Sequence, residues 1–296
     1  MGIAFFTFIL ALSFHSIAEE PAADTSHMTA EEFLSKLKFQ NGKIELPGGI
    51  ATLNLPDTFR YLDPTDSEKI LVDAWGNPPG TKTLGMILPS DVSPLDPNGW
   101  GVIITYDEDG HVDDSDADSI KYDELLADMK KATSEANEER KKQGYRGLNL
   151  IGWAENPSYD KANHKLYWAK ELEAEGANQH TLNYNIRVLG RKGVLVLNAV
   201  AGMSQIASIK NEMQHVIALT DFNKGYGYGD FNSSTDKVAE YGIAALVAGG
   251  VAAKLGLFAK LFALLLVFKK ALILGVIALW AGIKKFFGMQ SKDSSH

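Results

Sequence analysis

The chain has 296 residues, of which 45% are hydrophobic, and its formal net charge is −8. It contains no cysteine, which excludes disulfide frameworks and thiol catalysis. Residues 238–296 hold seven of the 29 basic and two of the 37 acidic residues, which leaves residues 1–237 with a formal charge of −13. This acidity argues against a nucleic acid partner, because phosphate backbones bind basic surfaces.

Residues 1–18 resemble a secretory signal peptide. An apolar run from Ile3 to Phe14 is followed by the small residues Ser16 and Ala18 and then by two glutamates. No lysine or arginine precedes the run, so an uncleaved anchor is the alternative. Either reading predicts export of the domain that follows, after a linker over residues 19–27.

Residues 28–221 predict an exported α+β domain with a mainly antiparallel sheet and flanking helices. The domain opens with a helix, because Thr29 and Glu32 form a capping-box pattern. Further helices are expected at 63–74, in a long segment ending near Gln143, and at 204–219. Strands are expected at 43–46, 50–55, 59–62, 83–88, 99–106, 148–155, 165–173, 181–189 and 194–200.

The strand at 181–189 alternates most clearly between apolar and polar residues, which predicts one buried and one solvated face. Its apolar positions are Leu182, Tyr184, Ile186 and Val188, and its polar positions are Asn183, Asn185 and Arg187.

The C-terminal part of the chain predicts attachment to a membrane. Residues 222–237 are expected to form a tether, residues 238–287 a transmembrane helical anchor, and residues 288–296 a polar tail. A first span over 238–259 meets the requirement of about 20 apolar residues. A second apolar run, 261–283, carries Lys269 and Lys270 near its middle, so it either spans as the arm of a hairpin or lies in the interface.

Small residues recur at intervals of four within the first expected span, at Ala245, Gly249 and Ala253. This spacing lets two membrane helices approach closely, and it predicts a homo-oligomer formed through the anchor. The alternative is that small residues are simply frequent in spanning helices.

An acidic loop at residues 107–118 partly matches a calcium-binding loop. Asp107, Asp109, Asp113 and Asp116 fall at the third, fifth, ninth and twelfth positions of that pattern. Thr105 stands at the first position, however, and an aspartate replaces the bidentate glutamate at the twelfth. The loop therefore predicts no metal site and no cofactor; its carboxylates are expected to face a helix N-terminus.

Catalytic residues remain unknown from the sequence, because no nucleophile elbow, phosphate loop or dinucleotide fingerprint is present. Candidate bases or ligands are His111, His164, His180 and His215, and candidate paired carboxylates are Glu155, Asp160, Glu171 and Glu173. Four aromatic residues could line a binding groove or fill the core: Trp153, Tyr159, Tyr167 and Trp168.

Several segments resemble a family of uncharacterised bacterial membrane-anchored proteins defined by domain of unknown function 2167. They include WGNPPG (75–80), HKLYWAKEL (164–172) and HTLNYNIRVLGRKGVLVLNAVAGM (180–203). The resemblance implies an exported, tethered domain and supplies no catalytic residues. The order of hairpins and late helix also resembles the fold of the photosystem extrinsic P protein and its relatives.

These observations predict a membrane-anchored envelope protein of unknown molecular activity. We expect a binding or scaffolding domain on the outer, periplasmic side of the cytoplasmic membrane, with the lipid membrane as a partner and an unidentified ligand. One alternative is an envelope hydrolase that uses strand-borne carboxylates with His164 or His180. The other is a membrane-active oligomer in which the C-terminal tail is the effector.

Overall fold

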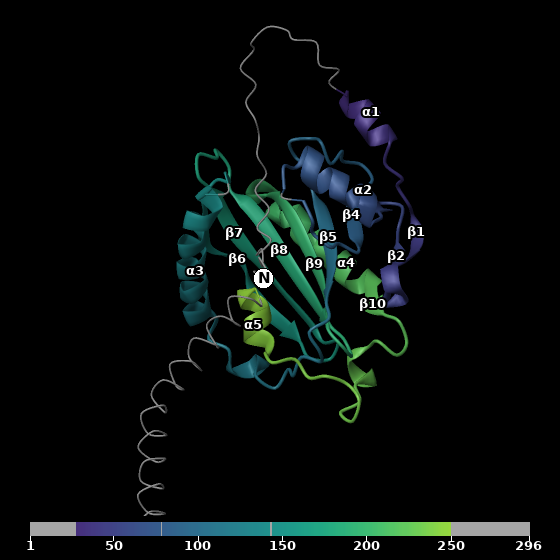
Figure 1. Ribbon diagram of the computed structural model, residues 1–296, viewed down its shortest axis with the longest axis vertical. Coiled ribbons are helices and arrows are strands. Elements are labelled where there is room, and N and C mark those ends of the chain that lie inside the picture. Colours follow the sequence, from purple (N-terminus) through teal and green to yellow (C-terminus); the bar gives the residue numbers. More distant parts are fainter. Residues whose placement is uncertain (1–27, 78, 143, 250–296) are drawn as a thin grey trace, which may run out of the picture. The chain divides into compact units, whose positions relative to one another are not determined.

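A seven-stranded antiparallel sheet forms the centre of the computed structural model, which describes residues 28–77, 79–142 and 144–249 (Figure 1). The strand order is β3-β4-β5-β9-β8-β7-β6. The strands are β3 (Phe59–Leu62), β4 (Gly85–Pro89), β5 (Gly101–Asp107), β6 (Leu148–Asp160), β7 (Lys165–Ala174), β8 (Thr181–Leu189) and β9 (Val194–Gly202). The predicted α+β class with a mainly antiparallel sheet is confirmed.

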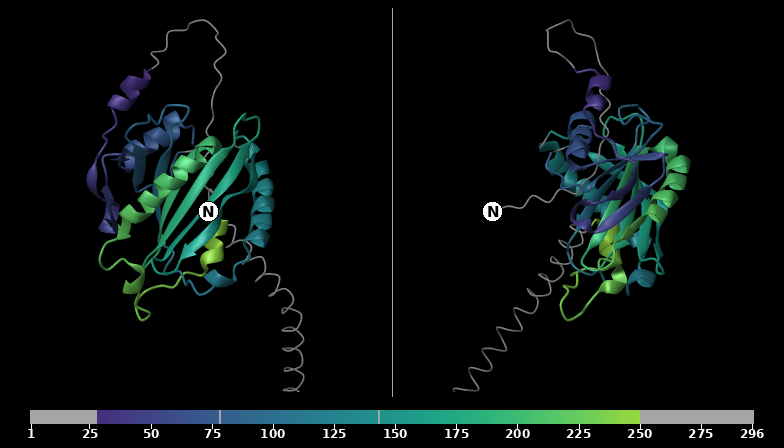
Figure 2. Two further views of the ribbon diagram at one scale, coloured as in Figure 1. Left: turned by 180° about the vertical axis from the view of Figure 1, so that it is seen from behind. Right: turned by 90° about the vertical axis from the view of Figure 1, so that its right-hand side faces the viewer.

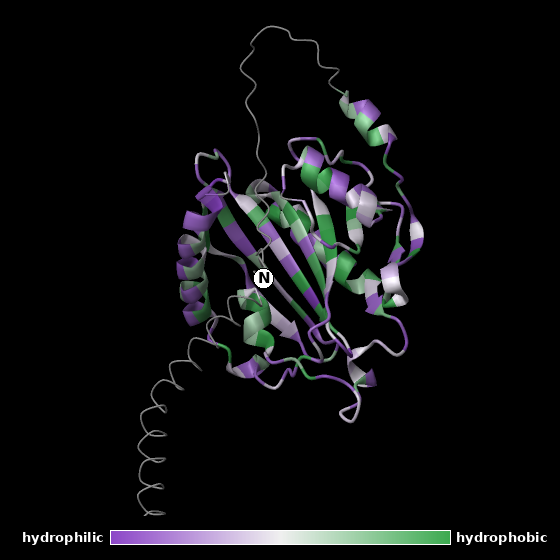
Figure 3. Cartoon of the chain, in the orientation of Figure 1, coloured by the Kyte–Doolittle hydropathy of each residue, from purple (hydrophilic) through white to green (hydrophobic). Residues whose placement is uncertain are grey.

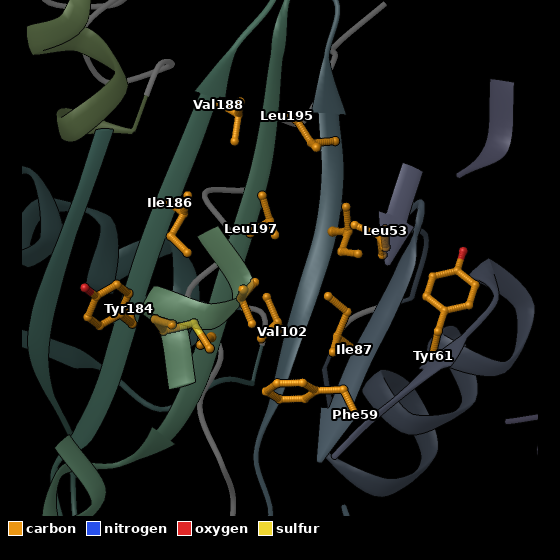
Figure 4. Close-up of a cluster of buried hydrophobic side chains, with 14 of the residues drawn as sticks. Leu53, Phe59, Tyr61, Ile87, Val102, Tyr184, Ile186, Val188, Leu195 and Leu197 are labelled. Carbon is orange, nitrogen blue, oxygen red and sulfur yellow. The ribbon is translucent and has the colours of Figure 1, made fainter. Parts of the chain in front are cut away.

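One face of this sheet, called the rear face here, is covered by helix α4 (Ile206–Leu219) and by a small second sheet. Figure 2 shows α4 lying over the strands on this side of the sheet. The small sheet has the order β1-β2-β10, with β1 (Gly42–Glu45), β2 (Ala51–Leu55) and β10 (Thr220–Phe222). The apolar side chains that fill the space between these layers are called the rear cluster here. Figure 4 shows several of them, among them Leu53, Tyr184, Ile186 and Leu197.

The opposite, front face is covered at its two ends by different helices. Over β3, β4 and β5 lies α2 (Pro64–Lys69), which continues into a π-helical turn at Ile70–Ala74. Asp63 caps α2 by accepting the backbone N–H of Asp66 at 2.9 Å, and Pro64 occupies the first turn, where no N–H is needed. Ile70 and Leu71 bury themselves against Met86 and Ile103.

At the other end of the front face lie α3 (Tyr122–Lys142) and α5 (Ile243–Ala248). Met129 of α3 and Leu246 of α5 belong to one apolar cluster with Leu166 and Trp168 of β7, which we call the front cluster. Asn137 of α3 also pairs with the start of β6, since its side chain exchanges two hydrogen bonds, 2.8 and 2.9 Å long, with the backbone of Leu148. The N-terminal helix α1 (Ala30–Ser35) has the predicted capping box at Thr29 and Glu32.

The expected transmembrane span over residues 238–259 is wrong at its start. Val238 forms a parallel β-bridge with His111, and α5 is a six-residue helix whose Ile243, Leu246 and Val247 are buried in the front cluster. The helix ends at Gly249, which takes the left-handed conformation at φ 94°. Among the described residues, no helix is long and apolar enough to cross a membrane.

The predicted helix contact through Ala245, Gly249 and Ala253 therefore lacks its continuous helix. Ala245 is 8% exposed within the domain, and Gly249 turns the chain out of the helix. Ala253 lies outside the described residues, as do the expected signal peptide (1–18), the linker (19–27), the remainder of the anchor (250–287) and the polar tail (288–296).

Residues 222–237, the expected tether, are tied along the domain. Gly227 pairs with Gly190 in an antiparallel bridge, and Asp236 receives two hydrogen bonds from Arg191, at 2.7 and 3.1 Å. The hydroxyl of Tyr228 donates to the carbonyl of Val112 at 3.0 Å. This segment is a structural part of the domain rather than a free connection.

Candidate functional site

The acidic loop holds the C-terminal segment of the domain in place. Asp109 accepts a 2.8 Å hydrogen bond from the hydroxyl of Tyr241, and Asp116 accepts the backbone N–H groups of Ile243 and Ala244 at 3.0 and 3.4 Å. Gly110 allows the loop backbone to lie close to the C-terminal segment, because it has no side chain and its φ is 117°. A Cβ added there would lie 2.8 Å from the carbonyl oxygen of Lys237.

The four aspartates of the calcium-like pattern do not gather around one point. Asp113 accepts the backbone N–H of Ser115 at 2.8 Å, while Asp109 and Asp116 face the C-terminal segment and Asp107 ends β5. In the part of the chain that the structure describes, no three histidine, aspartate or glutamate side chains form a group that could hold a metal ion.

The aromatic residues proposed as a groove divide between different surroundings. Tyr167 packs with the rear cluster, whereas Trp153 and Trp168 belong to the front cluster. Tyr159 donates a 2.7 Å hydrogen bond to Asp114 and lies 3.2 Å from Nδ1 of His164. The burial of its ring raises the pKa of Tyr159 well above its usual value.

His164 and His111 form part of an aromatic stack with the segment that follows β10. The ring of His164 stacks on Tyr228 with centroids 3.9 Å apart, and the ring of His111 stacks on Phe231 at 4.0 Å. His164 also has a positive φ of 52°, which non-glycine residues adopt infrequently. Desolvation lowers the pKa of His111, whose Nδ1 lies 3.3 Å from the carbonyl oxygen of Gly190.

The strand carboxylates do not form a facing pair of acids. Glu171 and Glu173 flank His180, at 2.6 and 3.7 Å from its two ring nitrogens, and the Glu171 hydrogen bond raises the pKa of His180. Three other candidates lie elsewhere: Glu155 binds Lys210 at 2.8 Å, Asp160 accepts the N–H groups of its own turn, and His215 is exposed beside Glu212.

The sequence did not indicate a polar strip that lies in the middle of the front face, between the front cluster and the apolar cluster that α2 covers. Its members come from three neighbouring strands: Lys170 of β7, Asn183, Asn185 and Arg187 of β8, and Asn198 of β9. Hydrophilic positions are visible there among the central strands in Figure 3. We call this set the central polar strip.

The predicted solvated face of β8 is wrong for its two asparagines, which are each 3% exposed. They satisfy one another instead. Asn183 donates to Oδ1 of Asn198 at 2.8 Å, and Asn185 donates to the carbonyl and side-chain oxygens of Asn183 at 3.0 and 2.9 Å. Burial of these amides is tolerated because they hydrogen-bond within the strip.

The two cations of the strip are partly exposed and lie in a desolvated environment. Desolvation lowers the pKa of Lys170 to about 8 and that of Arg187 to about 10. The guanidinium carbon of Arg187 lies 5.0 Å from the centroid of the Trp168 ring. Within the described residues, neither cation has a carboxylate oxygen at ion-pair distance.

The cations were hard to find from the sequence because Lys170 and Arg187 occupy alternate positions of two strands, as ordinary surface residues would. The available signal was the lysine two places after Trp168, which puts both side chains on one sheet face.

The fold and the strip define a class: an α+β domain with a cationic, donor-rich strip on one face of an antiparallel sheet. The chain belongs to the family described as "Protein of unknown function (DUF2167)", whose model matches residues 14–280. No curated protein matches the chain.

Two solved structures are similar to this chain at low identity. The solution structure of cyanobacterial PsbP (CyanoP) from Synechocystis sp. PCC 6803 is 13% identical and covers 62% of this chain and 92% of its own, with a TM-score of 0.34. The Saccharomyces cerevisiae Ran-binding protein Mog1p is 12% identical and covers 62% and 96%, with a TM-score of 0.33.

Proposed function

We propose that this protein is a binding domain of the bacterial envelope that takes a ligand on the front face of its sheet. The central polar strip is the observation that carries this proposal. Between two apolar clusters, Lys170 and Arg187 remain partly exposed, and no carboxylate oxygen of the described residues lies at ion-pair distance from either; Asp107 acts on Arg187 from farther away. Charged groups in such a place cost desolvation free energy, which a ligand can offset.

Binding is favoured over catalysis by the way the candidate acids are used. Asp109 and Asp116 hold the C-terminal segment, and Glu171 is bonded to His180. A pair of carboxylates for acid–base chemistry would have to face a common space, as in glycoside hydrolysis. These carboxylates instead stabilise the fold.

We further propose that the domain works on the outer side of the cytoplasmic membrane. The signal-like start of the chain supports export. The apolar, lysine-bearing composition of residues 250–287 supports the lipid membrane as a partner.

The location can be tested with a single introduced cysteine, because the native chain has none. Lys131→Cys replaces a residue of α3 whose side chain is 77% exposed. In spheroplasts with an intact cytoplasmic membrane, an impermeant maleimide should label this cysteine in the full-length protein. Labelling that occurs only after lysis would place the domain in the cytoplasm and contradict the proposal.

The ligand face can be tested by a small-molecule screen on the full-length protein in micelles. Ligands that raise the unfolding temperature should move the indole N–H resonances of Trp153 and Trp168 on the front face. Hits that move only Trp100, which belongs to the rear cluster, would place the binding surface elsewhere and contradict the proposal.

A second candidate function, hydrolysis, rests on His164. Its Nδ1 lies 3.2 Å from the Tyr159 hydroxyl and 3.4 Å from Oδ2 of Asp114, an arrangement that orients an imidazole as a general base. Turnover of chromogenic esters that is lost in His164→Gln and kept in His215→Gln would support this function. Equal turnover in both variants would exclude His164 as the base.

A further inference from the structure

Two indole N–H groups beside the central polar strip have no hydrogen-bond acceptor among the described residues. They are Nε1 of Trp153 and Nε1 of Trp168, and both nitrogens are buried. Trp168 as a whole is 1% exposed. A buried N–H without an acceptor is unfavourable, and in native proteins such a group is infrequent enough to require a reason.

Strand register puts these donors next to the cations. Lys170 is the cross-strand partner of Trp153 on one side and of Asn183 on the other, so the three side chains share the front face. Trp168 lies two positions before Lys170 on the same face, with the guanidinium carbon of Arg187 5.0 Å from its ring centroid.

Two of the three amide oxygens of the strip are occupied, whereas most N–H groups of its two cations are not. Oδ1 of Asn198 and Oδ1 of Asn183 each receive an amide N–H from a neighbouring asparagine. The ammonium of Lys170 has no hydrogen bond within the described structure, and Arg187 has one, at 3.0 Å to the carbonyl of Ile186. The ligand that complements this surface is therefore rich in acceptors.

The charge of the surface points in the same direction. Both titratable members of the strip are cations, although residues 1–237 carry a formal charge of −13. Asp107 and Tyr241 act electrostatically on Arg187 and favour its charged form. A negatively charged group bound beside Lys170 would favour the charged ammonium in the same way.

Building on the proposed function, we propose that the ligand carries an oxyanion group, and that Lys170, Arg187 and the indole N–H groups of Trp153 and Trp168 bind it. Arginine and lysine are the usual binders of phosphate and carboxylate, and an indole N–H can only donate. The shared chemistry is a small oxyanion, supplied either by a free molecule or by a lipid headgroup.

The test uses the full-length protein in zwitterionic micelles, with ¹⁵N-labelled tryptophan. The chain has five tryptophans. Inorganic phosphate, and separately acetate, is titrated at constant ionic strength and pH 7. At least one of these anions should move the indole resonances of Trp153 and Trp168 in a saturable way, while those of Trp75 and Trp100 stay in place.

Lys170→Gln and Arg187→Gln should each weaken the anion affinity by about tenfold or more, because each removes a charge-assisted hydrogen bond. Lys131→Gln removes the same charge from an exposed position of α3 and should leave the affinity unchanged. Unmoved Trp75 and Trp100 resonances in each variant verify its fold.

The titration is repeated in micelles that contain phosphatidylglycerol. Shifts of Trp153 and Trp168 in those micelles, and not with the free anions, would assign the oxyanion to a lipid headgroup. Equal affinity in the wild type and in both Gln variants would overturn the assignment of Lys170 and Arg187.

If no anion moves the two resonances while a neutral or cationic molecule from the screen does, the oxyanion proposal fails and the front-face binding function stands. If no ligand of any charge moves them, both proposals fail.

Discussion

The carboxylate of Asp116 accepts the backbone N–H of Ile243 at 3.0 Å, across 127 positions of the chain. Gly242, which precedes α5, has no side chain with which to cap the helix, so a residue of the acidic loop supplies the acceptor. This contact holds the N-terminus of α5 against the acidic loop.

Removing that acceptor should loosen the C-terminal segment. Asp116→Ala is expected to lower the free energy of unfolding by about 1 kcal/mol, the usual cost of losing a helix cap. Urea unfolding measures the loss, and hydrogen exchange should quicken at Ile243 and Ala244. Asp118→Ala, in the same loop but highly exposed, should change neither quantity. An equal loss in both variants would show that Asp116 has no special part in docking α5.

The burial of α5 gives a larger expected effect. Leu246 is 3% exposed in the front cluster, so Leu246→Ala should lower the free energy of unfolding by about 2–5 kcal/mol through lost transfer energy and a cavity. Val238→Ala, at a position that is 50% exposed, should cost about 0.5 kcal/mol or less. If Leu246→Ala is no more costly than its control, α5 does not pack on the domain as described.

The His180–Glu171 pair should make stability depend on pH near neutrality. The hydrogen bond to Glu171 raises the folded-state pKa of His180, so its contribution is fully present below the unfolded value of about 6.5. That contribution is lost as the pH rises through the folded-state pKa. The difference in unfolding temperature between wild type and His180→Gln should therefore be larger at about pH 5.5 than at about pH 8.5. A difference that stays constant with pH, or grows in alkali, would contradict this.

The Asp236–Arg191 pair should act in the acid range. The hydrogen bonds from Arg191 lower the pKa of Asp236 to about 2, so the stabilisation is present above the unfolded value of about 3.9. It is lost as the pH falls through the folded-state pKa. Asp236→Asn should be less stable than wild type at pH 6, and the two should converge towards pH 2. The exposed substitution Asp57→Asn should show no such convergence.

Local pattern alone determined much of the fold. The capping box at Thr29 and the alternation of strand 181–189 both depend on neighbours a few residues apart, and both elements are present. Successive strands joined by short turns then imply antiparallel pairing, which the sheet has throughout.

Tertiary structure decided what the apolar residues after Val238 do. A buried helix and the first turns of a membrane span have the same composition, so Ile243 and Leu246 could not be assigned from sequence. The acidic loop and β7 lie at least 69 positions before α5, and only the folded sheet brings them against it.

The candidate site shows the same limit. The sequence singled out Trp153 and Trp168, but it treated Arg187 as solvated and gave Lys170 no role. Whether a polar strand position meets water or a neighbouring amide depends on the cross-strand register of β6 to β9 and on which helices cover the sheet. That register places Lys170 between Trp153 and Asn183, and it is a property of paired strands rather than of any one segment.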